Sequence, residues 1–293
     1  MRAAIPQVRR RHRALGALFL ALAVAGCGGG ASDTSVAPTE PASGGDSGPE
    51  HVHGLGVRGG TLYIATHTGL WEAPARETKA RRVGPSRQDI MGFSIISSDR
   101  FIGSGHPAPG QNLPPNLGLI ESRDGGRTWK GVSLLGQADF HVLQSAGRRV
   151  YGFDGTQGRL MVSSNDGRSW AQRTPPAGIF ALAIDPRRPD DIVASTERGL
   201  FASPNAGRGW RPMRNDLGGL LAWPAPDRLY MVDGSGRVQV SGDGGRSWRA
   251  LGSIGGQPAA FIAHGRDLYA ALGDASVVHS TDGGRTWTVR ATP

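Results

Sequence analysis

The sequence predicts an all-β fold, a six-bladed β-propeller over residues 51–293, and three observations support this prediction. A motif of Ser, Asp or Asn, Gly and Trp recurs five times at nearly constant spacing. Each interval consists of short strand-like runs separated by Gly and Asp turns, and no stretch shows a helical period. Repeats of about 40 residues with four strands each are typical of β-propellers.

The five copies of the motif, here called the repeat turns, start 41, 40, 38 and 39 residues apart: SRDGGRTW (122–129), SSNDGRSW (163–170), SPNAGRGW (203–210), SGDGGRSW (241–248) and STDGGRTW (280–287). Ser, Asp and Asn side chains bond readily to the backbone N–H groups of their own turn. The shared Gly supplies a backbone conformation that other residues resist, and the Trp buries apolar surface beside the turn. We therefore expect a structural role for the turns, with the recurring Arg on their surface.

The spacing sets the blades at about 51–86, 87–135, 136–175, 176–216, 217–253 and 254–293. A seventh blade would require units near 35 residues, which the repeat spacing contradicts. The first blade lacks its repeat turn. The chain ends on the outer strand of the sixth blade, so the sequence does not predict how the ring closes.

Residues 1–27 have the pattern of a lipoprotein signal peptide. Five arginines precede an apolar run, 14–26, that is short for a membrane-spanning helix, and the run ends at Cys27 after small residues, as in a lipobox. The alternatives are an ordinary signal peptide or an uncleaved anchor. We expect a lipid on Cys27, which would hold the protein on the cell membrane facing outside the cytoplasm. Cys27 is the sole cysteine, so the folded part can contain neither a disulfide nor a catalytic thiol.

Residues 28–50 are rich in Gly, Ser, Pro and Thr without an aromatic residue, which predicts a flexible linker. The net charge of +9 overstates the charge of the mature chain. The five signal-peptide arginines belong to the 33 basic residues, which leaves 28 basic against 24 acidic residues. This balance, together with the lack of a recognition motif, gives no indication of a nucleic-acid partner.

The histidines indicate where a functional site lies. The repeat turns join the third and fourth strands of each blade, so they share one end of the ring, the lower end. Loops between the second and third strands, and loops between blades, then lie at the upper end. Five of the seven histidines in 51–293 map to the upper end of blades 1 to 3: His51, His53, His67, His106 and His141. His51 and His53 share one side of the first strand by the period of two.

Other polar or soft side chains map to the same region: Arg87, Asp89, Met91, Asn112 and Asp139. Asn112 belongs to an insertion, 103–116, that is the longest loop of the propeller and contains four prolines. A long loop stiffened by proline suits a binding role. We therefore predict a binding site formed by His51, His53, His67, Met91, His106, Asn112 and His141.

The repeat turns resemble the Asp-box, or BNR, repeat, and the whole of 51–293 resembles bacterial Asp-box lipoproteins labelled glycosylhydrolase or sialidase-like. The stretches HVHGLGV, SRQDIMGF, GSGHP, NLPPNLGLIES and DFHVL are similar to the signature of that group. The same repeat occurs in sialidases, xyloglucanases, the sortilin propeller and a photosystem II assembly factor. The resemblance implies that the upper end of blades 1–3 recognises or hydrolyses a glycan, although the fold alone does not choose among these functions.

The residues argue against classical sialidase chemistry. The Arg-Ile-Pro segment of sialidases is missing. Sialidases also pair a nucleophilic Tyr with a Glu, but all four tyrosines here fall in second-strand patterns, which are core positions: Tyr63, Tyr151, Tyr230 and Tyr269.

Three hypotheses remain open. In a different glycosidase, Asp89 would be the acid, Asp139 the base, and Arg87 would orient the substrate, because hydrolysis requires two carboxyl groups. Alternatively, His51, His53, His67, His106 and His141 supply ligands to copper or zinc, with the Met91 thioether favouring copper. In the third hypothesis the propeller binds a glycan or a protein partner without turnover. No hypothesis but the second requires a cofactor.

Overall fold

The computed structural model describes residues 48–293, and these form the predicted six-bladed β-propeller. The predicted signal peptide (1–27), Cys27 and residues 28–47 of the predicted linker lie outside the described residues. Within 48–293, no helix is long and apolar enough to cross a membrane.

Each blade is a four-stranded antiparallel sheet of consecutive strands. The strands are β1 Val52–Arg58, β2 Thr61–Thr66, β3 Gly69–Ala73 and β4 Arg81–Arg82 in blade 1; β5 Asp89–Ser97, β6 Arg100–His106, β7 Leu119–Ser122 and β8 Lys130–Ser133 in blade 2; β9 Phe140–Ala146, β10 Arg149–Asp154, β11 Arg159–Ser163 and β12 Ala171–Arg173 in blade 3; β13 Ile179–Asp185, β14 Arg188–Thr196, β15 Gly199–Ser203 and β16 Arg211–Arg214 in blade 4; β17 Leu220–Ala225, β18 Arg228–Val232, β19 Arg237–Ser241 and β20 Arg249–Ser253 in blade 5; β21 Pro258–His264, β22 Asp267–Leu272, β23 Val277–Ser280 and β24 Thr288–Ala291 in blade 6.

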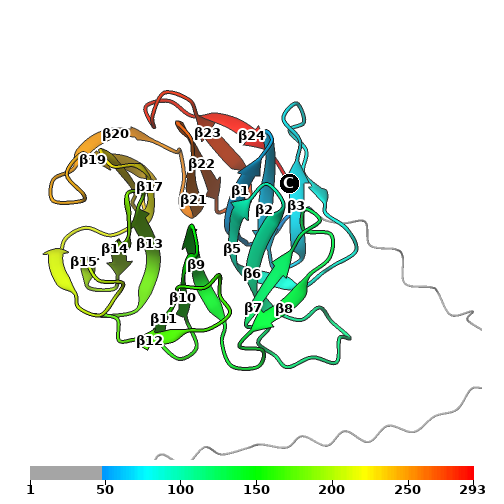
Figure 1. Cartoon of the computed structure of the whole chain (residues 1–293). Helices are drawn as coiled ribbons and strands as arrows, with labels where there is room; N and C mark the ends of the chain where they lie inside the picture. The colour runs from blue at the N-terminus through cyan, green and yellow to red at the C-terminus, as the bar shows by residue number, and fades with distance from the viewer. Residues whose placement is uncertain (1–47) are drawn as a thin grey trace, which may run out of the picture. The chain divides into compact units, whose positions relative to one another are not determined.

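The first strand of every blade lies at the centre of the ring (Figure 1). Each of these strands contacts the first strand of the next blade, and β1 contacts β21. The blades approach so closely here that side chains must be absent at some positions. A Cβ on Gly92 of β5 would lie 2.4 Å from the Phe140 carbonyl oxygen of β9.

Apolar side chains fill the space between neighbouring blades, because alternate residues of a strand face its two sides. Ile64 and Trp71 of blade 1 pack in one cluster with Tyr269 and Val277 of blade 6. All four tyrosines lie in second strands and are buried, as the sequence predicted. The core is therefore a set of layers between blades and continues across the junction of blades 1 and 6.

The repeat turns are held by their own side chains. In all five, the Ser hydroxyl accepts a hydrogen bond from the backbone N–H of the Gly four residues later, at 2.7–2.9 Å. The same hydroxyl donates to the Asp or Asn side chain at 2.8–2.9 Å. The recurring Arg donates to the backbone carbonyl of that Asp or Asn, which is the structural role expected for it.

The ring closes where the sequence left closure undetermined. Thr292 bonds through its backbone to Thr78 and Ala80, at 2.7 and 3.2 Å, in an isolated parallel bridge. The Arg290 guanidinium donates to carbonyl oxygens of the same segment, including those of Ala73 and Glu77 at 2.8 and 2.9 Å. The segment between β3 and β4 thus takes the position of a repeat turn in blade 1 and receives the end of blade 6.

Candidate functional site

The five upper-end histidines come from the positions that the topology predicts. His51 lies just before β1 and His53 near its start, His67 lies in the turn after β2, His106 at the end of β6, and His141 near the start of β9. The repeat turns follow the third strands and so lie at the other end of each antiparallel sheet. The structure divides the five histidines into two groups, each centred on a carboxylate.

The first group, here called the Asp89 cluster, consists of His53, His67 and Asp89. One donor atom from each of the three side chains lies within 4.8 Å of the other two. The Nδ1–H of His67 donates to Asp89 Oδ2 at 2.8 Å, and the His53 and His67 rings meet edge to face with centroids 4.3 Å apart. Blades 1 and 2 thus bring two imidazoles and a carboxylate to one point.

His53 is the most perturbed side chain of the Asp89 cluster. Its Nε2 is buried without a hydrogen-bond partner among the described residues and lies 4.0 Å from Asp89 Oδ1, too far for a direct bond. Asp89 Oδ1 is likewise buried and unpartnered. Burial and the neighbouring His67 imidazole lower the pKa of His53 to about 4, so at neutral pH its ring carries a free lone pair.

His51 lies just before β1 rather than within it, and the register of β1 is irregular between Val52 and Gly54. His51 and His53 therefore do not alternate along one regular strand, as the period of two had predicted. His51 has a left-handed backbone, with φ of 51°, which is unfavourable for a residue with a Cβ. The His51 ring instead contacts His67, with centroids 5.1 Å apart.

The second group, here called the Asp139 cluster, consists of Asp139, His141 and His106. The Nε2–H of His141 donates to Asp139 Oδ2 at 2.7 Å, and His106 Nε2 lies 3.5 Å from the same oxygen. The hydrogen bond to Asp139, partly opposed by burial, raises the pKa of His141. The His106 Nδ1–H donates to the Pro115 carbonyl at 2.8 Å, which ties the ring to the insertion.

A pocket of about 220 Å³ at the centre of the ring connects the two clusters. His53, Met91 and His141 line it, together with apolar side chains of the first strands. Phe180 of β13 also lines it and is 45% exposed. The pocket therefore places an imidazole of each cluster, the Met91 thioether and an accessible aromatic ring in one space.

Arg87 and Asn112, also predicted as site residues, occupy other places. Arg87 lines a separate surface pocket with its neighbour Ser86 and with Gln111, which belongs to the insertion. Asn112 is exposed in the same insertion. Neither lines the central pocket.

The sequence reasoning treated the carboxylates as a pair and the histidines as a separate set. The structure instead bonds Asp89 to His67 and Asp139 to His141. Gln88, which the sequence places in the same polar stretch as Asp89, is buried, with its Oε1 accepting from the Ser86 hydroxyl at 2.9 Å and its amide nitrogen unpartnered among the described residues. The separation of only two residues between Asp139 and His141 was the available signal for their bond, whereas Asp89 and His67 lie 22 residues apart.

Comparisons with known proteins agree on the fold. No family model and no curated protein matches the chain. Among solved structures, a chain of a nidogen/laminin complex superposes with a TM-score of 0.62 at 16% identity, covering 80% of this chain and 93% of that one. YCF48 from Cyanidioschyzon merolae superposes with a TM-score of 0.51 at 16% identity, covering 84% and 86%.

The GH74 xyloglucanase from Xanthomonas campestris has a TM-score of 0.57 at 17% identity. The alignment covers 83% of this chain but only 45% of the xyloglucanase, so the chain spans less than half the length of that enzyme. At such identities the likeness concerns the fold alone, and the fold it shows is the β-propeller.

Proposed function

We propose that this protein is a lipid-anchored, extracytoplasmic propeller that binds a transition metal ion, copper or zinc, at the Asp89 cluster. The observation that carries the proposal is the convergence of donor atoms from His53, His67 and Asp89 within 4.8 Å of one another. Imidazole nitrogen and carboxylate oxygen are ordinary ligands of both metals. The anchor is Cys27, as expected from the sequence.

The hydrogen bonding of the cluster supports this proposal. His67 Nδ1 and Asp89 Oδ2 face each other at 2.8 Å, and an ion that displaces the proton between them would gain both atoms as ligands, because metal binding releases protons from its ligands. The unpartnered His53 Nε2 and Asp89 Oδ1 face each other at 4.0 Å. Tetrahedral ligands lie about 3.4 Å apart around zinc, so small side-chain rotations suffice to close the site.

Two neighbouring side chains offer further donor atoms. His51 contacts His67 and could supply a further nitrogen, and its left-handed backbone is the kind of local strain found at functional sites. Met91 lines the same pocket as His53, and a thioether favours copper over zinc.

Isothermal titration calorimetry of the soluble propeller (48–293) with copper and with zinc tests the proposal. We expect one saturable site with micromolar or tighter affinity for at least one metal. His53→Ala should weaken binding by about 100-fold or more, because removing even a residue that only orients a ligand costs about 10–100-fold. The control is His264→Ala, which removes an exposed imidazole at the end of β21. This histidine lies in blade 6, outside the Asp89 cluster. Equal affinities of the His53 variant and the unsubstituted protein would exclude the site.

A glycan ligand is the second candidate, and the specific observation that favours it is Phe180. An exposed aromatic ring in one pocket with the His53 and His141 imidazoles offers a face for sugar stacking. The xyloglucanase likeness is consistent with a glycan ligand. Hydrolysis is less well supported than binding, because Asp139, the predicted base, is only 2% exposed. Reducing-sugar release from a polysaccharide panel, abolished by Asp89→Asn, would favour hydrolysis.

A further inference from the structure

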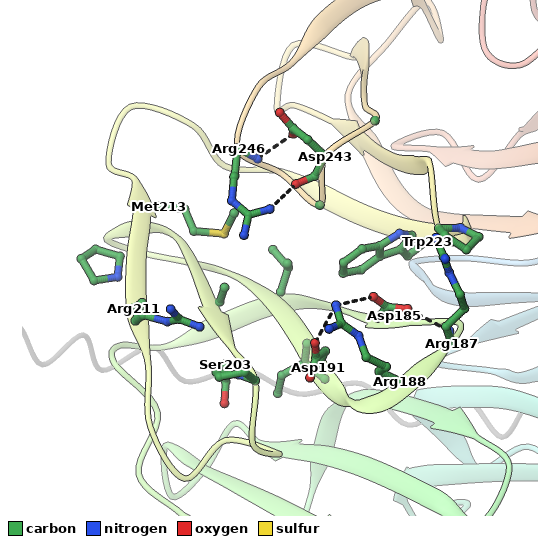
Figure 2. A pocket seen from close by; sticks show the side chains of 18 residues that line it. Asp185, Arg187, Arg188, Asp191, Ser203, Arg211, Met213, Trp223, Asp243 and Arg246 are labelled. Carbon is green, nitrogen blue, oxygen red and sulfur yellow. Dashed lines mark hydrogen bonds and ion pairs between the residues drawn. The ribbon is translucent and has the colours of Figure 1, made fainter.

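A second, larger pocket lies at the lower end of the ring, between blades 4 and 5 (Figure 2). Its volume is about 900 Å³, within the usual range for small-molecule sites. It is formed by the turn between β13 and β14, the start of β16, the end of β17 and the repeat turn of blade 5. None of its lining residues belongs to the Asp89 or Asp139 cluster, so this pocket is separate from the proposed metal site.

Four arginines line this pocket: Arg187, Arg188, Arg211 and Arg246. Two of them already have partners for their guanidinium groups. Arg188 pairs with Asp191 at 2.9 Å and with Asp185 at 3.3 Å, and Arg246 donates to the carbonyl of its own repeat turn at 2.8 Å.

The other two arginines, Arg187 and Arg211, have no ion-pair or hydrogen-bond partner for their guanidinium groups among residues 48–293. Figure 2 shows them on opposite sides of the pocket, Arg187 at the turn beside Asp185 and Arg211 on β16. Two uncompensated guanidinium groups around one cavity make it favourable for oxyanions, which guanidinium groups bind through paired hydrogen bonds.

The remaining wall is apolar and aromatic. Trp223 at the end of β17 lies in the lining with Met213, Pro212 and Pro226, and its indole packs against Gly244 of the repeat turn, where a Cβ would lie 3.4 Å from the ring. The Trp223 Nε1–H is buried and has no acceptor among the described residues. The pocket thus combines a flat apolar surface, an unused donor and two free cations.

From this combination we infer that the pocket binds a small ligand in which a phosphate or carboxylate group is attached to a flat apolar body. The oxyanion lies between Arg187 and Arg211, and the flat part lies against Trp223. A phosphate and a carboxylate would accept hydrogen bonds from the same guanidinium donors. Binding experiments with one probe of each kind therefore decide which group the pocket prefers.

Tryptophan fluorescence or calorimetry with three probes tests the inference: phenyl phosphate, benzoate and inorganic phosphate. We expect saturable binding of phenyl phosphate or benzoate, tighter than that of inorganic phosphate because the ring contacts Trp223. The preferred aromatic probe identifies the anionic group. Arg187→Gln and Arg211→Gln should each weaken binding by about tenfold or more, since hydrogen bonds to charged groups are the strong ones.

Two further variants make the test specific. Trp223→Leu should remove the advantage of the aromatic probes while leaving inorganic phosphate binding in place. Arg198→Gln is the matched control, because Arg198 is an exposed arginine in the turn between β14 and β15, at the other end of blade 4. Absence of saturable binding for all three probes would overturn the inference. Affinities unaffected by Arg187→Gln and Arg211→Gln, in variants that keep the normal melting temperature, would also overturn it.

Discussion

Asp243 illustrates how a single side chain organises a repeat turn. Its Oδ1 accepts the backbone N–H groups of Arg246 and Ser247 at 3.0 and 2.9 Å, and its Oδ2 accepts the Ser247 hydroxyl at 2.6 Å. The hydrogen bonds from Ser247 lower the pKa of Asp243 to about 2. The carboxylate is therefore favoured in its charged form by the folded turn, not by a partner elsewhere in the molecule.

This bonding predicts a pH dependence of stability. A carboxyl group whose pKa falls on folding stabilises the protein above its unfolded pKa of about 3.9, and this contribution is lost as the pH falls towards 2. Asp243→Asn keeps the Oδ1 acceptor, as the natural Asn205 does with the Gly209 N–H at 2.9 Å, but loses the charge. We expect the substitution to cost about 1 kcal/mol or less at pH 6, because Asp243 is exposed and solvent screens the effect.

Urea unfolding between pH 2 and pH 6 measures this effect. The difference in unfolding free energy between the unsubstituted protein and Asp243→Asn should shrink as the pH is lowered. The reverse change, Asn205→Asp, should introduce a pH-dependent contribution in blade 4. A difference that is constant across this range would show that the charge of Asp243 contributes nothing to the turn.

At the same scale, the residue types of the candidate site could be predicted but their pairing could not. The upper-end position of His67 and Asp89 follows from strand order. Their hydrogen bond depends on how closely blades 1 and 2 approach, and a single sequence contains no measure of that distance. The burial of Asp139, which disfavours it as a catalytic base, is also set by packing between neighbouring blades.

Among the elements, the first strands carry the closest contacts of the fold. Gly54, Gly56 and Gly92 lie on these strands, and a Cβ on any of them would come within 2.9 Å of the adjacent strand. Glycine is required here for space rather than for backbone conformation, since none of the three has a positive φ.

Gly92→Ala is therefore expected to destabilise the propeller by about 1–3 kcal/mol, the usual cost of inserting a group into a filled core. The added Cβ would lie 2.4 Å from the Phe140 carbonyl oxygen, and backbone cannot move aside cheaply. Denaturant unfolding checks this against Gly131→Ala on β8, where a Cβ would meet nothing within 4 Å. If the two variants proved equally stable, close approach of β5 and β9 would not constrain residue 92.

The strands themselves were largely predictable, because the period of two and the turn residues are local signals. In blade 6 the runs AAFIAHG, DLYAALG and SVVHS have the local pattern of strands, and they correspond to β21, β22 and β23. The outer strand of blade 1, β4, has only two residues and no repeat turn before it, so its position rested on blade spacing alone. The pocket beside Trp223 was missed because its residues come from five separate stretches of two blades.

For the whole molecule, the number of blades followed from spacing, whereas closure of the ring did not. A propeller ring can be closed by one sheet that combines strands from the two ends of the chain. In this propeller, by contrast, every sheet consists of consecutive strands. Closure depends on Thr292, on the Arg290 guanidinium and on the apolar layer between β1 and β21. These contacts join positions more than 200 residues apart, which no local pattern specifies.

The closure also places residues 48 and 293 side by side, since a Cβ on Gly48 would lie 3.1 Å from the carbonyl carbon of Pro293. Because no blade borrows a strand from another, a short peptide joining these two residues would leave all six sheets whole when the backbone is opened between any two blades. The propeller is thus suited to circular permutation, and a fusion partner could be attached at any of six seams around the ring.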